Sequence, residues 1–234
     1  MALSHNSFIR GFNSIYQQAP RIQPADSMDF VGYCLAWHDC VAEHHHYEET
    51  AFFPAIDKAV GEKGVMEGAV EQHGTSSYPA PSKLIANLST AAFHDGLERF
   101  KSYLLEKGLH FSPMELIAIM DSFSEPLYTH LKAEPPSILA LSRFNTPQKP
   151  IDIVAMALEA GKKSVTVSFV FNVLPVFLLN METVEFEGGM WHNVFPPFNK
   201  VVKWIMTKGA PLWQRRRWRF ASCTPQGKVK HLAV

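Results

Sequence analysis

Histidine–glutamate pairs at helical spacing are the feature of this chain that most restricts its fold. The segment 43–54 contains two pairs four residues apart, His44 with Glu48 and His45 with Glu49. Residues four apart share one face of a helix. The stripe through the first pair consists of Trp37, Val41, His44, Glu48, Phe52 and Ile56. Because this stripe is otherwise apolar, we expect His44 and Glu48 to point inward and the more polar stripe through His45 to face outward.

The same pattern recurs on other segments. About one His-x3-Glu pair is expected by chance at this composition, so recurrence carries the argument. His130 and Glu134 again interrupt an apolar stripe, and His5 and His73 each lie on a further one. A carboxylate inside a core is costly unless it is paired or binds a metal. Mixed imidazole and carboxylate ligands suit iron, manganese or zinc and disfavour copper(I) or an iron–sulfur cluster.

A segment rich in Gly, Ser and Pro, from Gly74 to Leu88, predicts a loop between two of these histidines. If residues 74–90 are removed, His73 and His94 fall four apart on one continuous apolar stripe. We therefore interpret residues 74–90 as an insertion into a helix. Two origins of the insertion stay open, a genuine excursion of the chain and a translated intron.

Helical patterns cover the first 145 residues and become less clear beyond them. We expect helices from Ser4 to about Gln18, from Asp29 to the Phe52–Pro54 region, from Gly64 to His73, from Ser89 to Glu106, and from a Ser112 cap to about Glu134, where Pro135 and Pro136 follow. Residues 151–181 are consistent with two helices, and the aromatic, proline-rich tail has little periodicity. This predicts an all-α domain over 1–145 and a mainly helical or irregular C-terminal extension over 146–234.

Composition narrows the function classes. The chain of 234 residues is 47% hydrophobic and carries 22 basic and 22 acidic residues, so no global field favours nucleic acid or anionic lipid. The three scattered cysteines do not predict a disulfide framework. The apolar stretch 164–181 is interpreted as a buried, kinked helix and not a membrane span. Without a secretory signal, we expect a cytoplasmic protein.

Several of these segments together resemble one known family. The matching pieces are Ser4-His-Asn with Arg10-Gly-Phe-Asn-Ser-Ile-Tyr, His44-His-His-Tyr-Glu-Glu-Thr-Ala-Phe-Phe-Pro, Val70-Glu-Gln-His, Phe93-His-Asp-Gly-Leu-Glu and Pro126-Leu-Tyr-Thr-His-Leu-Lys-Ala-Glu. The chain resembles the hemerythrin-like, His-His-Glu cation-binding family, most closely its fungal forms. The resemblance covers roughly residues 1–145, and the combination of pieces is more specific than any one of them.

The resemblance implies an up-and-down four-helix bundle that encloses two non-haem irons, with manganese or zinc as alternatives. Carried over position by position, it implies a first-helix ligand, pairs on the second, third and fourth helices, and a bridging role for the second-helix carboxylate. The implied metal ligands are His5, His44, Glu48, His73, His94, His130 and Glu134.

Three functions remain open at this level. The first is a di-iron protein that binds O2 or iron for storage, sensing or detoxification. The second is a di-iron oxidase or oxygenase that acts on a small molecule. The third is a metal-free interaction scaffold whose site has decayed. The choice between the first two depends on residues around the ligands and on access to the metal, which the sequence does not fix.

Overall fold

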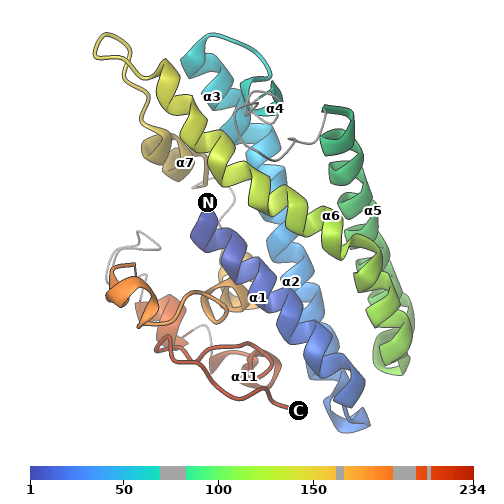
Figure 1. Cartoon of the computed structure of the whole chain (residues 1–234). Helices are drawn as coiled ribbons and strands as arrows, with labels where there is room; N and C mark the ends of the chain where they lie inside the picture. The colour runs from blue at the N-terminus through green and yellow to red at the C-terminus, as the bar shows by residue number, and fades with distance from the viewer. Residues whose placement is uncertain (69–82, 162–165, 192–203, 210–211) are drawn as a thin grey trace. The chain divides into compact units, whose positions relative to one another are not determined.

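The computed structural model describes residues 1–68, 83–161, 166–191, 204–209 and 212–234, and these residues are mainly helical. β pairing among them is limited to the isolated bridges Thr146–Lys149 and Cys223–Val229, with no strand. The all-α class predicted from the sequence is therefore confirmed. Figure 1 follows the helices from the blue N-terminus to the red C-terminus.

Four long helices precede the C-terminal extension. They are α1 (Ala2–Gln18), α2 (Ser27–Tyr47), α5 (Lys83–Lys107) and α6 (Pro113–Ala140). Short elements lie between and after them: 3₁₀ turns at Ala19–Arg21, Pro24–Asp26, Gly108–His110 and Leu141–Phe144, a π-helical turn at Glu48–Phe52, α3 (Phe53–Val60) and α4 (Val65–Gly68).

Local signals explain several boundaries. The predicted Ser112 cap of α6 is confirmed, because its Oγ accepts a hydrogen bond from the Glu115 N–H at 3.4 Å. Ser4 is not a cap, since α1 already begins at Ala2. Gly61 ends α3 with φ of 89°, a left-handed conformation that glycine adopts without a steric cost. α5 begins at Lys83, six residues before the predicted start, because Lys83-Leu-Ile-Ala contains good helix formers.

The last turns of α6 depart most from the sequence prediction. Proline lacks an N–H and disfavours helical geometry in the residue before it, so the helix was expected to end near Glu134. Instead α6 runs through Pro135 and Pro136 to Ala140. Leu131 and Leu141, on either side of the two prolines, are each 1% exposed. Burial of this apolar face stabilises the continued helix against the local preference of proline.

The chain forms two compact units, and each has its own core. The first consists of Met1–Ala2, Ala42–Asp95 and Phe123–Val165, and the second of Leu3–Val41, Gly96–Ser122 and Thr166–Val234. The core of the first unit contains Phe52, Ile56, Val60, Val65, Met66, Leu141 and Ala160. These residues come from the π-helical turn, α3, α4, the end of α6 and α7 (Ile153–Gly161). Polar contacts reinforce this core, since the Tyr47 hydroxyl donates to the Ala157 carbonyl at 2.8 Å.

Aromatic side chains dominate the core of the second unit. Trp37 is 1% exposed and its Nε1 donates to the Phe8 carbonyl at 3.0 Å. Phe30 packs edge-on against Phe220, with ring centroids 5.1 Å apart. The Tyr33 hydroxyl accepts a hydrogen bond from the Asn180 amide at 2.9 Å. These contacts attach residues of the C-terminal extension to helices from the first half of the chain.

Within the extension, residues 164–181 do not form one long helix. The chain forms α8 (Val167–Asn172) and α9 (Leu174–Leu178), with a break at Val173 just before Pro175. The kink expected from the sequence is thus present, but α8 is partly exposed and only α9 is buried. Across the described ranges, no helix combines the length and apolar character needed to cross a membrane. The last short elements are a 3₁₀ turn at Phe186–Gly189, a π turn at Ile205–Gly209 and α11 (Arg215–Trp218).

The arginine run 215–219 is held by contacts within the second unit. Arg216 Nε lies 3.0 Å from Asp29 Oδ2, and Arg219 Nη2 lies 2.5 Å from Asp26 Oδ1. The Arg217 guanidinium lies 5.6 Å from the centroid of the Trp218 ring. These arginines therefore carry ion pairs and a cation–π contact within the second unit.

Candidate metal centre

Three predicted ligands meet in the first unit. His44 lies in the last turn of α2, Glu48 begins the π-helical turn, and Glu134 lies in α6. Each offers one ligand atom, and these atoms lie within 4.8 Å of one another. Within the group, His44 Nε2 lies 3.1 Å from Glu48 Oε1. Two segments that are far apart in the sequence thus contribute an imidazole and two carboxylates to one point.

The Glu48 carboxylate is deeply buried. Its side chain is 1% exposed, and among the described residues neither of its oxygens has a hydrogen-bond partner of acceptable geometry. Burial raises the pKa of Glu48 well above its usual value, and the neighbouring Glu134 charge raises it further. Two carboxylates in this position are unfavourable together unless a cation compensates them.

The amino group of Met1 is one such cation in the metal-free chain. Burial lowers the pKa of this α-amino group, and attraction to Glu48 and Glu134 opposes that change. The same positive charge lowers the pKa of Glu48, although burial and Glu134 have larger effects in the other direction. The amino group therefore offsets only part of the cost of the two carboxylates.

The π-helical turn sets the direction of Glu48. The Phe53 N–H donates to the Glu48 carbonyl five residues earlier, so the turn contains one more residue than an α-helical turn. Phe52 at the end of the turn and Ile56 in α3 are 2% and 0% exposed and pack in the core of the first unit. Turns of this kind are frequent at functional sites. Here the turn begins at the candidate ligand Glu48 and ends at the buried Phe52.

His130 and His94 lie in the same unit but differ in exposure. His130 Nε2 is 4.0 Å from Glu134 Oε2, and its side chain is 18% exposed. His94 Nε2 is 3.5 Å from Glu49 Oε1, and its side chain is 40% exposed. Glu134 is therefore shared, because it contacts His130 and also belongs to the group with His44 and Glu48.

His45 was assigned to the outer face of its helix, and this assignment is wrong. It is 2% exposed, whereas the His44 side chain is 14% exposed. The His45 ring lies 4.8 Å from the Phe93 ring and 4.9 Å from the His130 ring, centroid to centroid. Aromatic neighbours on α5 and α6 bury it, which the polar residues of its own stripe did not predict. The signal that could have found it is the shared spacing of the pairs His44/Glu48 and His45/Glu49.

Two further residues, His5 and His73, were predicted as ligands. His5 lies on α1 in the second unit, where it is 2% exposed and its ring lies 6.4 Å from that of Phe8. His73 lies outside the described residues. The insertion expected at 74–90 falls mostly outside them too, apart from the start of α5 at Lys83.

The donor set fits a transition-metal ion. One imidazole and two carboxylates within 4.8 Å of each other are ligands that iron, manganese and zinc accept. The unpartnered oxygens of the buried Glu48 supply the negative charge that such an ion requires. No thiol belongs to the group, which disfavours copper(I) and iron–sulfur clusters at this position.

Comparison with known proteins adds one relative. The chain is 26% identical over 230 residues to the dimeric xanthone biosynthesis cluster protein R11 of Cryptosporiopsis sp. (strain 8999). The match covers 97% of this chain and 79% of the relative. No family model matches the chain. No solved structure matches it either.

Proposed function

We propose that this protein is a non-haem di-iron protein whose α1, α2, α5 and α6 form an up-and-down four-helix bundle around the metal. The observation that carries the proposal is the burial of Glu48 beside Glu134 and His44. An isolated hydrogen-bonded histidine is common in helical cores, but two adjacent buried carboxylates are not. A divalent cation removes the repulsion between them and satisfies the Glu48 oxygens.

For the first metal we propose His44, Glu48 and Glu134 as ligands, with His5 as a fourth. Helix α1 begins at Ala2 in the first unit, and His5 follows one helical turn later. The resemblance of the segment that begins at Ser4 implies this role for His5. A second imidazole reduces the net negative charge that the two carboxylates alone would give the site.

For the second metal we propose His130, His94 and His73. Glu134 lies close to this group too, since it contacts His130 as well as belonging to the first group. His45 is an additional donor for this ion, given its position next to His130. Phe93, which is 0% exposed, contacts the rings of His45 and His130 and excludes water from this side.

Two irons held by histidine and carboxylate supply a pair of electrons for the binding or reduction of O2. The contribution of the chain itself is to hold the metal ligands among buried side chains. Phe93, which contacts the rings of His45 and His130, is almost fully buried, and so is Phe52 at the end of the π-helical turn. We therefore favour an O2- or iron-binding protein used for storage, sensing or detoxification.

The test is the metal content of protein from iron-supplemented cells, together with its visible absorption in air and after reduction. We expect about two irons per chain. Glu48→Gln and Glu134→Gln should each reduce the iron content by half or more. Glu125→Gln is the matched control, because this exposed glutamate lies on α6 outside the proposed ligand set and accepts a hydrogen bond from the Thr129 hydroxyl at 3.2 Å. Full iron content in both ligand variants contradicts the assignment.

A second candidate function is a di-iron oxidase that acts on a small molecule. The name of the relative favours it, because that protein is assigned to a biosynthesis cluster for dimeric xanthones. Oxygen consumption that depends on an added phenolic substrate, and that Glu48→Gln abolishes, would support the oxidase. Iron-loaded protein that binds O2 without such turnover supports the binding function. If no preparation contains iron, the remaining function is the metal-free interaction scaffold.

A further inference from the structure

A second site candidate lies within the second unit. A cavity of about 260 Å³ is lined by one face of α1, by Thr183 and by the C-terminal segment. Its lining residues are Arg10, Asn13, Ser14, Gln17, Thr183, Ser222, Cys223, Val229, Lys230 and Leu232. The volume is below the range of drug-sized pockets, so a small ligand is expected.

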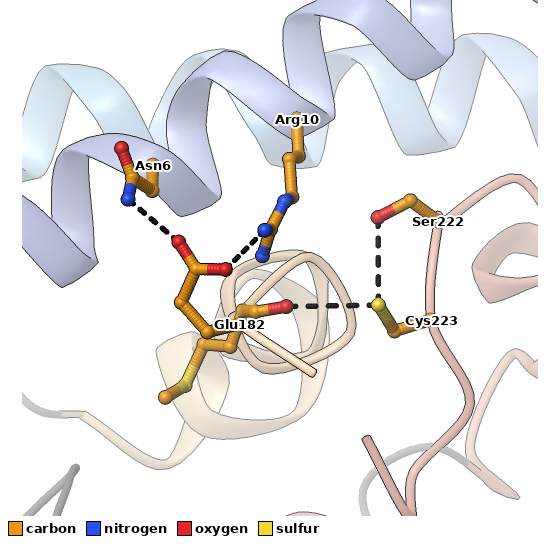
Figure 2. A network of polar contacts seen from close by, with 6 residues as sticks. Asn6, Arg10, Glu182, Ser222 and Cys223 are labelled. Atoms are coloured by element: carbon orange, nitrogen blue, oxygen red, sulfur yellow. Dashed lines mark hydrogen bonds and ion pairs between the residues drawn. The ribbon is translucent and has the colours of Figure 1, made fainter. Parts of the chain in front are cut away.

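Charge is unbalanced around this cavity. Arg10 and Lys230 both line it, and none of the described residues that line it is acidic. Glu182 is the ion-pair partner of Arg10 and does not itself line the cavity. Figure 2 shows its carboxylate between Asn6, which donates to Oε1 at 2.6 Å, and Arg10, which contacts Oε2.

Arg10 retains unused hydrogen-bonding capacity. Its Nη2 contacts Glu182, whereas its Nη1 is buried without a hydrogen-bond partner among the described residues. A buried guanidinium N–H without an acceptor is costly. Glu182 thus fixes the guanidinium in place, and the buried Nη1 is not exposed to the cavity.

Lys230 is the second basic residue of the lining. Its Nζ donates to the carbonyls of Arg219 at 2.7 Å and of Trp218 at 3.3 Å. An ammonium has three N–H groups, so one donor remains. Burial lowers the pKa of Lys230 to about 8, and the nearby Cys223 opposes this change. At neutral pH the group is still mainly protonated, and a bound anion would favour that charged form.

The walls of the cavity are preformed. Gln18 donates to the Phe220 carbonyl at 2.8 Å and accepts from the Ala233 N–H at 2.9 Å, which attaches the C-terminal segment to α1. The Cys223 N–H donates to the Leu179 carbonyl at 2.8 Å, and the Lys230 N–H to the Ser222 carbonyl at 3.1 Å. A site held in this way requires little reorganisation on binding.

We propose that this cavity binds a small organic carboxylate, with Lys230 holding the carboxylate group and Arg10, Val229 and Leu232 lining the cavity around the rest of the ligand. Asn13, Gln17 and Thr183 offer additional polar contacts. A charge-assisted donor favours a carboxylate over a neutral group of the same shape. The site does not depend on the metal centre, so the two proposals fail separately.

The first test compares benzoate with benzyl alcohol by isothermal titration calorimetry on the full chain. We expect benzoate to bind at least tenfold more tightly than benzyl alcohol. Lys230→Met should weaken benzoate binding at least tenfold. Lys228→Met is the matched control, because it removes the same charge from an exposed residue of the same turn that does not line the cavity. Equal affinity for the two probes, or equal loss in the two variants, overturns the proposal.

A second measurement uses the unmodified protein and does not depend on how a variant folds. Reductive methylation with formaldehyde, followed by peptide mass spectrometry, reports the accessibility of each lysine. We expect saturating benzoate to slow the labelling of Lys230 severalfold and to leave Lys228 unchanged. Unchanged labelling of Lys230 overturns the proposal. Inorganic phosphate serves as a third probe, and binding of phosphate more tightly than benzoate would overturn the assignment to a carboxylate.

Discussion

Replacement of Glu48 by glutamine should stabilise the metal-free protein and abolish its stabilisation by metal. The reasoning rests on the position of this carboxylate, which is 1% exposed and lies within 4.8 Å of a ligand oxygen of Glu134. Most substitutions of buried residues destabilise a protein, so a gain in stability would be diagnostic of two carboxylates placed together for a cation.

The size of the effect follows from the charges. Two full charges 4.8 Å apart repel by about 3.5 kcal/mol at an effective dielectric constant near 20. Protonation of Glu48 avoids this repulsion, but at pH 7 it costs up to about 3.4 kcal/mol for a group whose ordinary pKa is 4.5. Partial compensation by His44 and the Met1 amino group reduces either cost. We therefore expect Glu48→Gln to raise the free energy of unfolding by about 1–2 kcal/mol without metal.

The pH dependence has a defined sign. The folded pKa of Glu48 is raised, so this residue does not destabilise the metal-free protein below its unfolded pKa near 4.5. Stability is lost as the pH rises from there toward the folded pKa. The advantage of the glutamine variant should therefore be small at pH 4.5 and grow toward pH 7.

The assay is urea unfolding followed by circular dichroism, in EDTA and with ferrous ion under anaerobic conditions. Metal at 100 times its dissociation constant should stabilise the wild-type chain by about 2.7 kcal/mol per site. The variant should gain much less, and Glu125→Gln should behave as the wild type. A variant that is less stable than the wild type in EDTA refutes the charge argument. Equal stabilisation of both by metal refutes the assignment of Glu48 as a ligand.

Three further predictions concern the second unit. Gly11→Ala should lower the free energy of unfolding by about 1–3 kcal/mol, because the added Cβ would lie 2.5 Å from Cδ1 of the Trp37 ring. Urea denaturation measures this change, and an unchanged midpoint would contradict it. Cys34 is fully buried, and burial raises the pKa of its thiol, so it should not react with a disulfide reagent until urea unfolds the chain. Reaction of Cys34 at the rate of a free thiol in native buffer would contradict its burial. For Lys230, the folded pKa near 8 lies below the ordinary 10.5, so the wild type should gain stability relative to Lys230→Met, by roughly 1 kcal/mol, as the pH rises from 8 to 10. Parallel stability curves for these two proteins over that range would contradict the lowered pKa.

The pattern of residues predicted much of the candidate centre. A spacing of four residues selected His44 with Glu48 and His130 with Glu134. In the structure the two members of each pair contact each other. Helical spacing brings such pairs together whatever surrounds them, because it depends only on backbone geometry. The cap at Ser112 was predictable for the same reason, since the hydroxyl and the N–H that it accepts from are three residues apart.

Burial of His45 could not be predicted in this way. Its own stripe is polar, and its environment comes from Phe93 and His130 on other helices. The π-helical turn after His44 also changes which residues face the core, and no spacing rule reports an extra residue in a turn. The choice of the buried histidine therefore depended on neighbours distant in sequence.

The sequence by itself determined the helical class, the residue types of the candidate centre and the close pairs within it, because these follow from local periodicity and side-chain chemistry. The tertiary structure decided where α6 ends, since burial of Leu131 and Leu141 outweighs the local effect of Pro135 and Pro136. It also decided the cavity for which we propose carboxylate binding. Arg10 and Lys230 are separated by most of the chain, and only the packing of the C-terminal segment on α1 brings them to one cavity.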